Sequence, residues 1–160
     1  MRTNGLLSLV LLAFCACSSE PVYLEAHGQF GDGTPIDFRQ GATLTVGTDP
    51  ETGAWTARLQ SQDNSSPPFM GMIIQVNLDN LTTPGSYTVS HDGSGDAQIR
   101  LLVPAEGYMN STGYTADGNL DILELPIGDN DRFAGSFSSL VVNYQGQDIT
   151  VEQGTFRGQL

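Results

Sequence analysis

The main pattern in this sequence is an alternation of apolar and polar residues with a period of two. It is clearest between residues 70 and 78, where Met, Ile, Val or Leu occupies every second position. This period places one face of a β-strand in a core, whereas an amphipathic helix repeats every 3.6 residues. Similar segments cover 22–30, 36–46, 55–59, 99–103 and 120–125. We therefore predict an all-β domain of eight to ten antiparallel strands, folded as a sandwich or a partly closed barrel.

The last segments predict a long β-hairpin with a definite register. If Gln145 and Gly146 form a two-residue turn, three phenylalanines each fall opposite a glycine. The predicted pairs are Phe133 with Gly158, Gly135 with Phe156, Phe137 with Gly154, Leu140 with Val151 and Val142 with Ile149. An aromatic ring over a facing glycine covers bare backbone and helps to set the register. Because the apolar face switches near Ser138, we also expect a bulge or strong coiling there.

The residues of this hairpin resemble the closing hairpin of small bacterial lipoproteins of unknown function. The similar segments are Gly135-Ser136-Phe137, Ile149-Thr150-Val151 and Gly154-Thr155-Phe156, and Pro84-Gly85-Ser86-Tyr87 is similar to the Gly-x-Tyr before an edge strand in that family. The resemblance is clearest in the C-terminal half. It implies a compact β domain on a lipid anchor, and it carries no catalytic residue to this chain.

The N-terminus has the pattern of a secretory signal peptide. Arg2 is followed by an apolar run over 5–14, which is shorter than the roughly 20 residues of a spanning helix. Ala16 is a small residue directly before Cys17, whereas the bulky Phe14 precedes Cys15. This arrangement resembles the lipobox of bacterial lipoproteins, in which the cysteine is lipidated and becomes the new N-terminus. The alternative is an ordinary cleaved signal followed by a secreted domain.

These observations divide the chain into a signal peptide over 1–16, a lipidated Cys17 with a short tether over 17–21, and one β domain over 22–160. Ser18 is not the aspartate that retains lipoproteins in the inner membrane, so the resemblance implies an outer-membrane location. At about 3.5 Å per residue the tether reaches about 14 Å at most. We therefore expect the domain to lie close to the membrane.

Charge narrows the range of partners. The chain has 18 acidic and six basic side chains, and loss of Arg2 with the signal changes the net charge to 5 − 18 = −13. Such a surface repels nucleic acid and anionic headgroups, so we expect no nucleic-acid partner. With Cys15 removed and Cys17 lipidated, the mature domain has no disulfide and no thiol nucleophile.

Few residues suggest catalysis or metal binding. His27 lies on a polar strand face, and His91 begins a turn that contains Asp92 and Ser94. Gly-Ser-Gly around Ser94 is not a nucleophile elbow, which needs Gly-x-Ser-x-Gly between a strand and a helix. Paired carboxylates for glycoside hydrolysis are not visible in sequence. We expect no enzyme activity, no cofactor and no metal.

The alternative to the absence of a metal is a bound calcium ion. The runs Asp92-Ser94-Asp96 and Asp129-Asn130-Asp131 space oxygen ligands as a calcium loop does. Both runs lack the glycine and closing glutamate of an EF-hand, and turns use the same residue types.

The segment 104–118 is a candidate binding loop. It contains Tyr108, Asn110 and Tyr114, which combine flat rings with hydrogen-bonding groups suited to a sugar or a partner protein. The alternative is structural: alternate residues of this segment share one face of a strand, so it also fits a polar edge strand whose tyrosines pack on neighbours.

Together these features predict an outer-membrane-anchored lipoprotein that acts as a non-catalytic binding or envelope-associated accessory module. Its expected partners are the membrane, through the lipid, and an envelope protein or glycan. The alternatives are a calcium-dependent adhesion or glycan-binding module and a small hydrolase.

The lipidation site is directly testable. Cys17→Ser should leave unprocessed precursor, because the acylated thiol is lost, whereas Cys15→Ser should still yield lipidated protein. Metabolic labelling with a fatty-acid analogue and gel mobility measure both outcomes. Normal acylation of the Cys17→Ser protein would contradict this placement.

Overall fold

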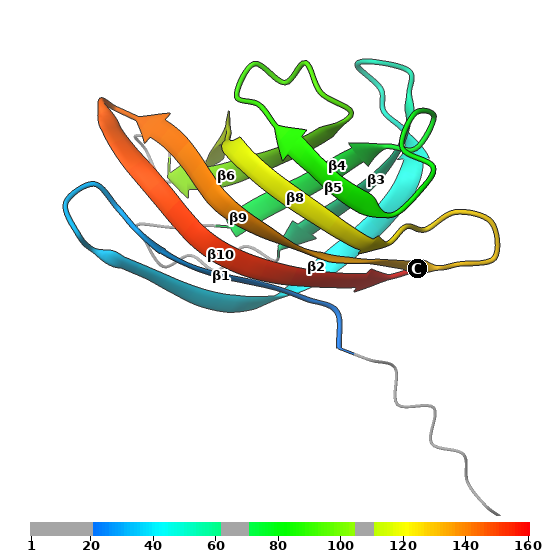
Figure 1. Ribbon diagram of the computed structural model, residues 1–160, viewed down its shortest axis with the longest axis horizontal. Helices are drawn as coiled ribbons and strands as arrows, with labels where there is room; N and C mark the ends of the chain where they lie inside the picture. Colours follow the sequence, from blue (N-terminus) through cyan, green and yellow to red (C-terminus); the bar gives the residue numbers. More distant parts are fainter. Residues whose placement is uncertain (1–20, 62–70, 105–110) are drawn as a thin grey trace, which may run out of the picture.

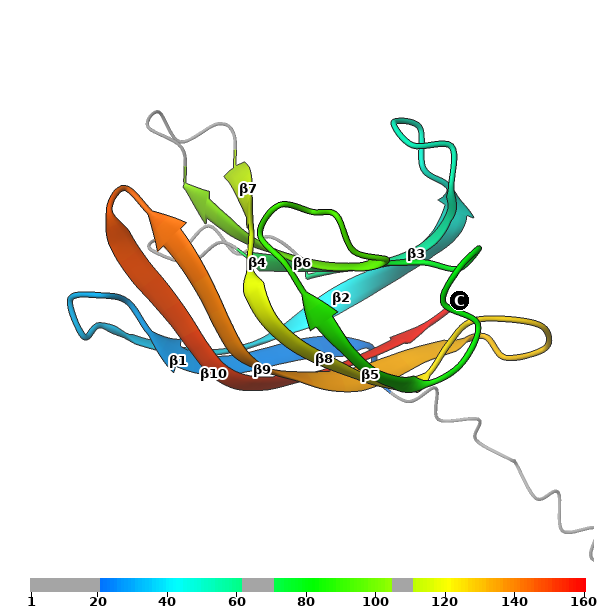
Figure 2. The ribbon, with the colours of Figure 1, turned by 45° about the horizontal axis from the view of Figure 1, so that its top comes forward.

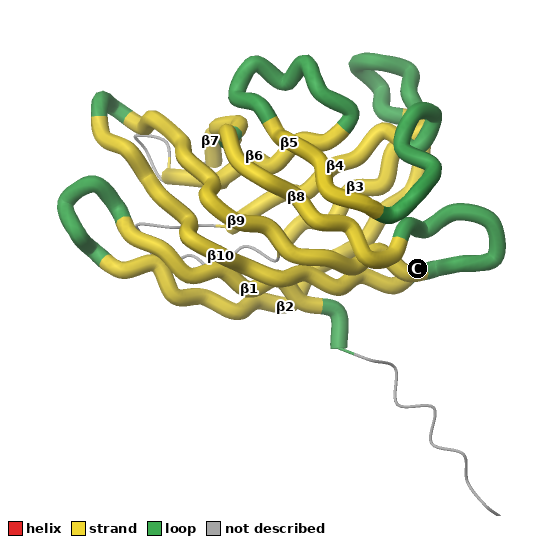
Figure 3. Tube along the Cα trace, in the orientation of Figure 1, coloured by secondary structure: helices red, strands yellow, loops and turns green. Residues whose placement is uncertain are grey.

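The computed structural model describes residues 21–61, 71–104 and 111–160, which form ten β-strands and no helix (Figure 3). The strands are β1 (Tyr23–Gln29), β2 (Pro35–Thr48), β3 (Trp55–Ser61), β4 (Gly71–Asn77), β5 (Gly85–Val89), β6 (Ala97–Pro104), β7 (Ser111–Thr115), β8 (Asp117–Glu124), β9 (Arg132–Tyr144) and β10 (Gln147–Gln159). All strand pairs are antiparallel. The predicted all-β class and strand number are confirmed.

Several predicted features lie outside the described residues. These are the signal peptide, Cys17 with most of the tether, and the candidate binding residues Tyr108 and Asn110. In the described part of the chain, no helix has the length and apolar character needed to cross a membrane.

The ten strands form one sheet in the order β5-β8-β9-β10-β1-β2-β3-β4-β6-β7. The sheet curls so that its two halves face each other as layers (Figures 1 and 2). Strand β2 belongs to both halves, because residues 35–41 pair with β1 and residues 42–48 pair with β3. A 14-residue strand of this kind turns one corner of a partly closed barrel.

The chain also passes between the two halves at Ala116. This residue is fully buried and separates β7, in one half, from β8, in the other. Its backbone N–H donates to the carbonyl oxygen of Ile99 at 2.8 Å, so β7 keeps contact with β6 up to the crossing. A small side chain suits this corner, because the residue is enclosed within the packed core.

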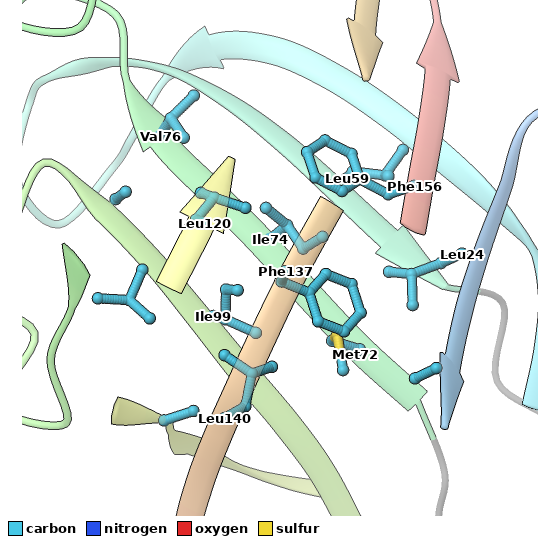
Figure 4. Close-up of a cluster of buried hydrophobic side chains, with 14 of the residues drawn as sticks. Leu24, Leu59, Met72, Ile74, Val76, Ile99, Leu120, Phe137, Leu140 and Phe156 are labelled. Atoms are coloured by element: carbon cyan, nitrogen blue, oxygen red, sulfur yellow. The ribbon is translucent and has the colours of Figure 1, made fainter. Parts of the chain in front are cut away.

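The core lies between the two halves of the sheet. Leu24, Phe137 and Phe156 come from one half, and they face Leu59, Ile74 and Ile99 from the other (Figure 4). All six side chains are at most 2% exposed. The period-two pattern thus places its apolar residues where the curled sheet encloses them.

The predicted register of the C-terminal hairpin is confirmed at all five pairs. Phe133, Phe137 and Phe156 stand opposite Gly158, Gly154 and Gly135, and the two aliphatic pairs also form. Gln145 and Gly146 both have positive φ, at 52° and 81°. This is the conformation of a type I′ turn, whose twist matches that of the two strands it joins.

Two of the three glycines make room for a phenylalanine ring. A Cβ atom on Gly135 would lie 2.8 Å from Cζ of Phe156, and one on Gly154 would collide with the Phe137 ring. Gly158 differs, because a Cβ there would meet Leu59 Cδ1 at 2.7 Å. The ring of Phe133, which stands opposite Gly158, packs instead against the ring of Phe156, with centroids 4.9 Å apart.

The predicted switch of the apolar face occurs at Ser139, which has φ of 55°. Strand β9 gains one residue there relative to β8, and β10 gains one at Glu152 relative to β1. The β9–β10 register is the same on both sides of this point. Two facing bulges therefore switch the buried face of both strands together, so that Phe137 and Leu140 are both buried.

Removal of one buried ring tests this hairpin. Phe156→Ala should lower the free energy of unfolding by about 3–5 kcal/mol, because it leaves a cavity in a packed core. Leu123→Ala removes a side chain that is 69% exposed and should change the value by about 0.5 kcal/mol or less. Urea denaturation measures both, and a loss below about 1 kcal/mol for Phe156→Ala would contradict the packing described.

Candidate functional site

Of the three predicted binding residues, only Tyr114 lies in the described part of the chain. It belongs to β7, so residues 111–115 form a strand at the edge of the sheet, as the structural alternative expected. The Tyr114 ring is half-buried against the core and meets the Tyr144 ring edge-on, at 5.2 Å between centroids and 81° between planes. Tyr114 is therefore packed on its neighbours, although it also borders a hollow.

This hollow, of about 520 Å³, lies between β7 and the end of β9, and we call it the notch. Its lining residues are His91, Gly113, Tyr114, Thr115, Asp117, Val141, Val142, Asn143 and Asp148. It exists because β8 begins at Asp117, opposite Val141, whereas β9 continues to Tyr144. The residues that precede Asp117 belong to β7, which lies in the other half of the sheet. The place of one strand beside the end of β9 is thus left open.

Two side chains from separate segments meet at one wall of the notch. Asp117 Oδ1 accepts the backbone N–H of His91 at 2.9 Å, and the imidazole Nδ1 lies 3.0 Å from Asp117 Oδ2. The backbone N–H of His91, and then its imidazole, hold the pKa of Asp117 below the ordinary value of 3.8. Asp117 therefore presents a stable negative charge, and it orients the ring of His91.

The opposite wall comes from the β9–β10 hairpin. The side-chain amide of Asn143 donates to Oδ1 of Asp148 at 3.0 Å, and both residues are exposed. Val141 adds an aliphatic surface that is 37% exposed. The notch thus combines two carboxylates, an imidazole, an amide and apolar surface, which is the composition of a recognition site.

The turn that was weighed as a hydrolase site has another role in the structure. The backbone N–H of Ser94 donates to Asp92 Oδ1 at 2.9 Å, which is the bond of an Asx turn. His91 is directed to Asp117 and contacts it from 26 residues away in sequence. The side-chain and backbone hydrogen bonds from Ser94 hold the pKa of Asp92 below its ordinary value, so both groups of Ser94 bind within this turn.

The two aspartate runs considered as calcium loops, within residues 92–96 and 129–131, form turns and side-chain hydrogen bonds in the structure. Asp96 Oδ1 accepts the side chain of Asn80 at 2.7 Å, and Asp131 Oδ2 accepts that of Gln159 at 3.0 Å. Over residues 21–61, 71–104 and 111–160, no three His, Cys, Asp or Glu side chains gather in a way that could hold a metal ion.

A second, smaller hollow of about 380 Å³ lies on the outer face of β1, β9 and β10. Its polar lining includes Glu25, His27 and Ser136. His27 bridges two carboxylates, with Nε2 3.1 Å from Glu25 and Nδ1 3.0 Å from Asp37. This hollow lies on strands that are paired on both sides, so only side chains are free to bind there. The notch offers backbone groups as well, and we therefore take it as the candidate site.

Sequence reasoning missed most of the notch. The facing pair of Asn143 and Asp148 was within reach, because the predicted hairpin register places these residues opposite each other. The contact of His91 with Asp117 was not predictable from the sequence, because no local pattern links residues 26 positions apart. No protein-family model matches this chain, and no curated protein or solved structure is detectably similar to it.

The charge of Asp117 gives a pH-dependent prediction. Its pKa in the folded state lies below the ordinary value of 3.8, so the ionised group stabilises the fold above that pH. This contribution is lost as the pH falls through the folded pKa. Asp117→Asn should therefore lower the urea midpoint at pH 7, and the difference from wild type should shrink as the pH falls below 3.8.

Asp129→Asn is the matched control for the loss of one negative charge, since Asp129 lies in an exposed loop. Urea denaturation of the three proteins between pH 7 and pH 3 gives the comparison. A difference between wild type and Asp117→Asn that stays constant over this range would contradict the contact with His91.

Proposed function

We propose that this chain is an outer-membrane lipoprotein whose β domain is a non-catalytic binding module, with the notch as its ligand site. The observation that carries the proposal is the notch itself. Carboxylates, an amide and an imidazole from three separate segments converge on one hollow beside an exposed aliphatic side chain. Convergent polar groups around a concave surface are what ligand recognition requires.

The position of the notch supports a role at the membrane. Tyr23, where the first strand begins, pairs with Arg157, and Arg157 pairs with Ala134 near the start of β9. Asn143 lies nine residues farther along β9, which corresponds to about 30 Å of strand. In Figure 1 the chain enters the domain at one end and the β9–β10 turn lies at the other. A lipid on Cys17 would thus leave the notch facing away from the bilayer.

The acidity of the chain supports the same proposal. With a net charge of −13 after loss of Arg2, the domain is repelled by anionic headgroups and stays beside the membrane rather than on it. The short tether keeps it nearby, and the notch remains open to envelope components.

Capture from the envelope tests the proposal. Val141→Arg places a long charged side chain in the notch, and it should reduce recovery of the bound envelope component about fivefold or more. Lipidated protein is immobilised in detergent and incubated with solubilised envelopes, and bound glycan and protein are quantified by mass spectrometry.

Leu123→Arg is the matched control, because Leu123 is an exposed apolar residue that does not line the notch. It should recover the same component as wild type. Equal recovery by wild type and Val141→Arg would refute the notch as the ligand site.

A further inference from the structure

We propose that the notch accepts an extended, basic segment of a partner polypeptide, which adds as a strand to the free edge of β7. This inference rests on the proposed function and names the class of ligand for the same site. Three features support it: the direction of backbone groups on β7, the direction of those at the end of β9, and the charges between them.

The first wall of the notch is an open strand edge. Strand β7 is the last in the sheet, and its pairing partner among the described strands is β6. Ala116 donates to the carbonyl of Ile99, and hydrogen-bonded pairs alternate along an antiparallel ladder. Tyr114 therefore directs its backbone groups to β6, whereas Gly113 and Thr115 direct theirs to the open edge.

The second wall is the unpaired end of β9. In a two-residue hairpin the residues that flank the turn form a hydrogen-bonded pair, here Tyr144 with Gln147. By the same alternation, the N–H and C=O of Asn143 point away from β10. Strand β8 begins opposite Val141, so within the described ranges no strand pairs with Asn143 on that side. Backbone donors and acceptors thus face the hollow from both walls.

These groups favour a peptide over a glycan. An extended peptide presents N–H and C=O groups at the spacing of a strand, and it can pair with the outward groups of Gly113 and Thr115. A sugar would instead use the exposed face of an aromatic ring. Among the described residues that line the notch, the one phenylalanine, tyrosine or tryptophan ring is that of Tyr114, which is half-buried and engaged with Tyr144.

The charges indicate a basic peptide. Asp117 and Asp148 lie on the two sides of the notch, and each carboxylate has acceptor capacity beyond the bonds it already makes. Side chains of an extended peptide alternate in direction. Lysine or arginine at one set of positions would reach the carboxylates, and apolar side chains at the other set would contact Val141. The negative charge of the whole domain attracts such a segment as well.

Peptide binding is measured by fluorescence anisotropy with the full-length lipidated protein in detergent micelles. The probe is a labelled octapeptide of alternating valine and arginine with blocked ends. A second peptide carries N-methyl groups on alternate amides, which removes backbone donors without changing charge. A third replaces arginine with glutamate. We expect saturable binding of the first peptide and at least about tenfold weaker binding of the other two.

Protein variants locate the binding. Asp117→Asn and Asp148→Asn should each lower the affinity for the first peptide about threefold, as expected for partly exposed ion pairs. Val141→Arg should abolish binding of this peptide. Asp129→Asn removes the same charge outside the notch and should leave affinity unchanged.

The outcomes separate this inference from the proposed function. No saturable binding up to about 1 mM peptide, or equal binding of the N-methylated peptide, would overturn strand addition. If Val141→Arg abolishes capture of an envelope glycan while no peptide binds, the proposed function stands and the peptide inference falls. If Val141→Arg changes neither capture nor peptide binding, both fall.

Discussion

The fold depends on the close contact of phenylalanine rings with facing glycines in the β9–β10 hairpin. Gly135 and Gly154 lie against Phe156 and Phe137, and a side chain on either glycine would displace a buried ring. A shift of one residue in register would move these rings to the outer face. These contacts therefore hold the longest hairpin in one register, and the neighbouring strands β1 and β8 pair against it.

The candidate site follows from the bulges in this hairpin and from the crossing beside them. Facing bulges at Ser139 and Glu152 keep β9 and β10 in register while both strands switch their buried face. At the end of β9 only β10 remains paired with it, because β8 begins at Asp117, opposite Val141. The residues before Asp117 cross at Ala116 from β7 in the other half. The open strand position is thus a consequence of how the sheet turns its corner. A gap of this kind exposes backbone groups that a partner strand can satisfy.

The charge of the domain and the position of the notch support the binding module at a membrane that we propose. The domain has a large net negative charge, and the notch lies at the end of β9 away from the start of β1. If the chain is attached through Cys17, as we propose, attachment and recognition at the notch use opposite ends of the domain.

The sequence by itself determined the features that depend on local pattern. Alternation predicted the strands, and the spacing of phenylalanine and glycine predicted the hairpin register, from which the facing pair of Asn143 and Asp148 follows. Only the tertiary structure decided the packing of Leu59 over Gly158, the contact of His91 with Asp117 and the open edge of β7. Period and register are properties of neighbouring residues and of one turn. The order of strands and the curl of the sheet depend on packing between segments that are far apart in the chain, which no local pattern records.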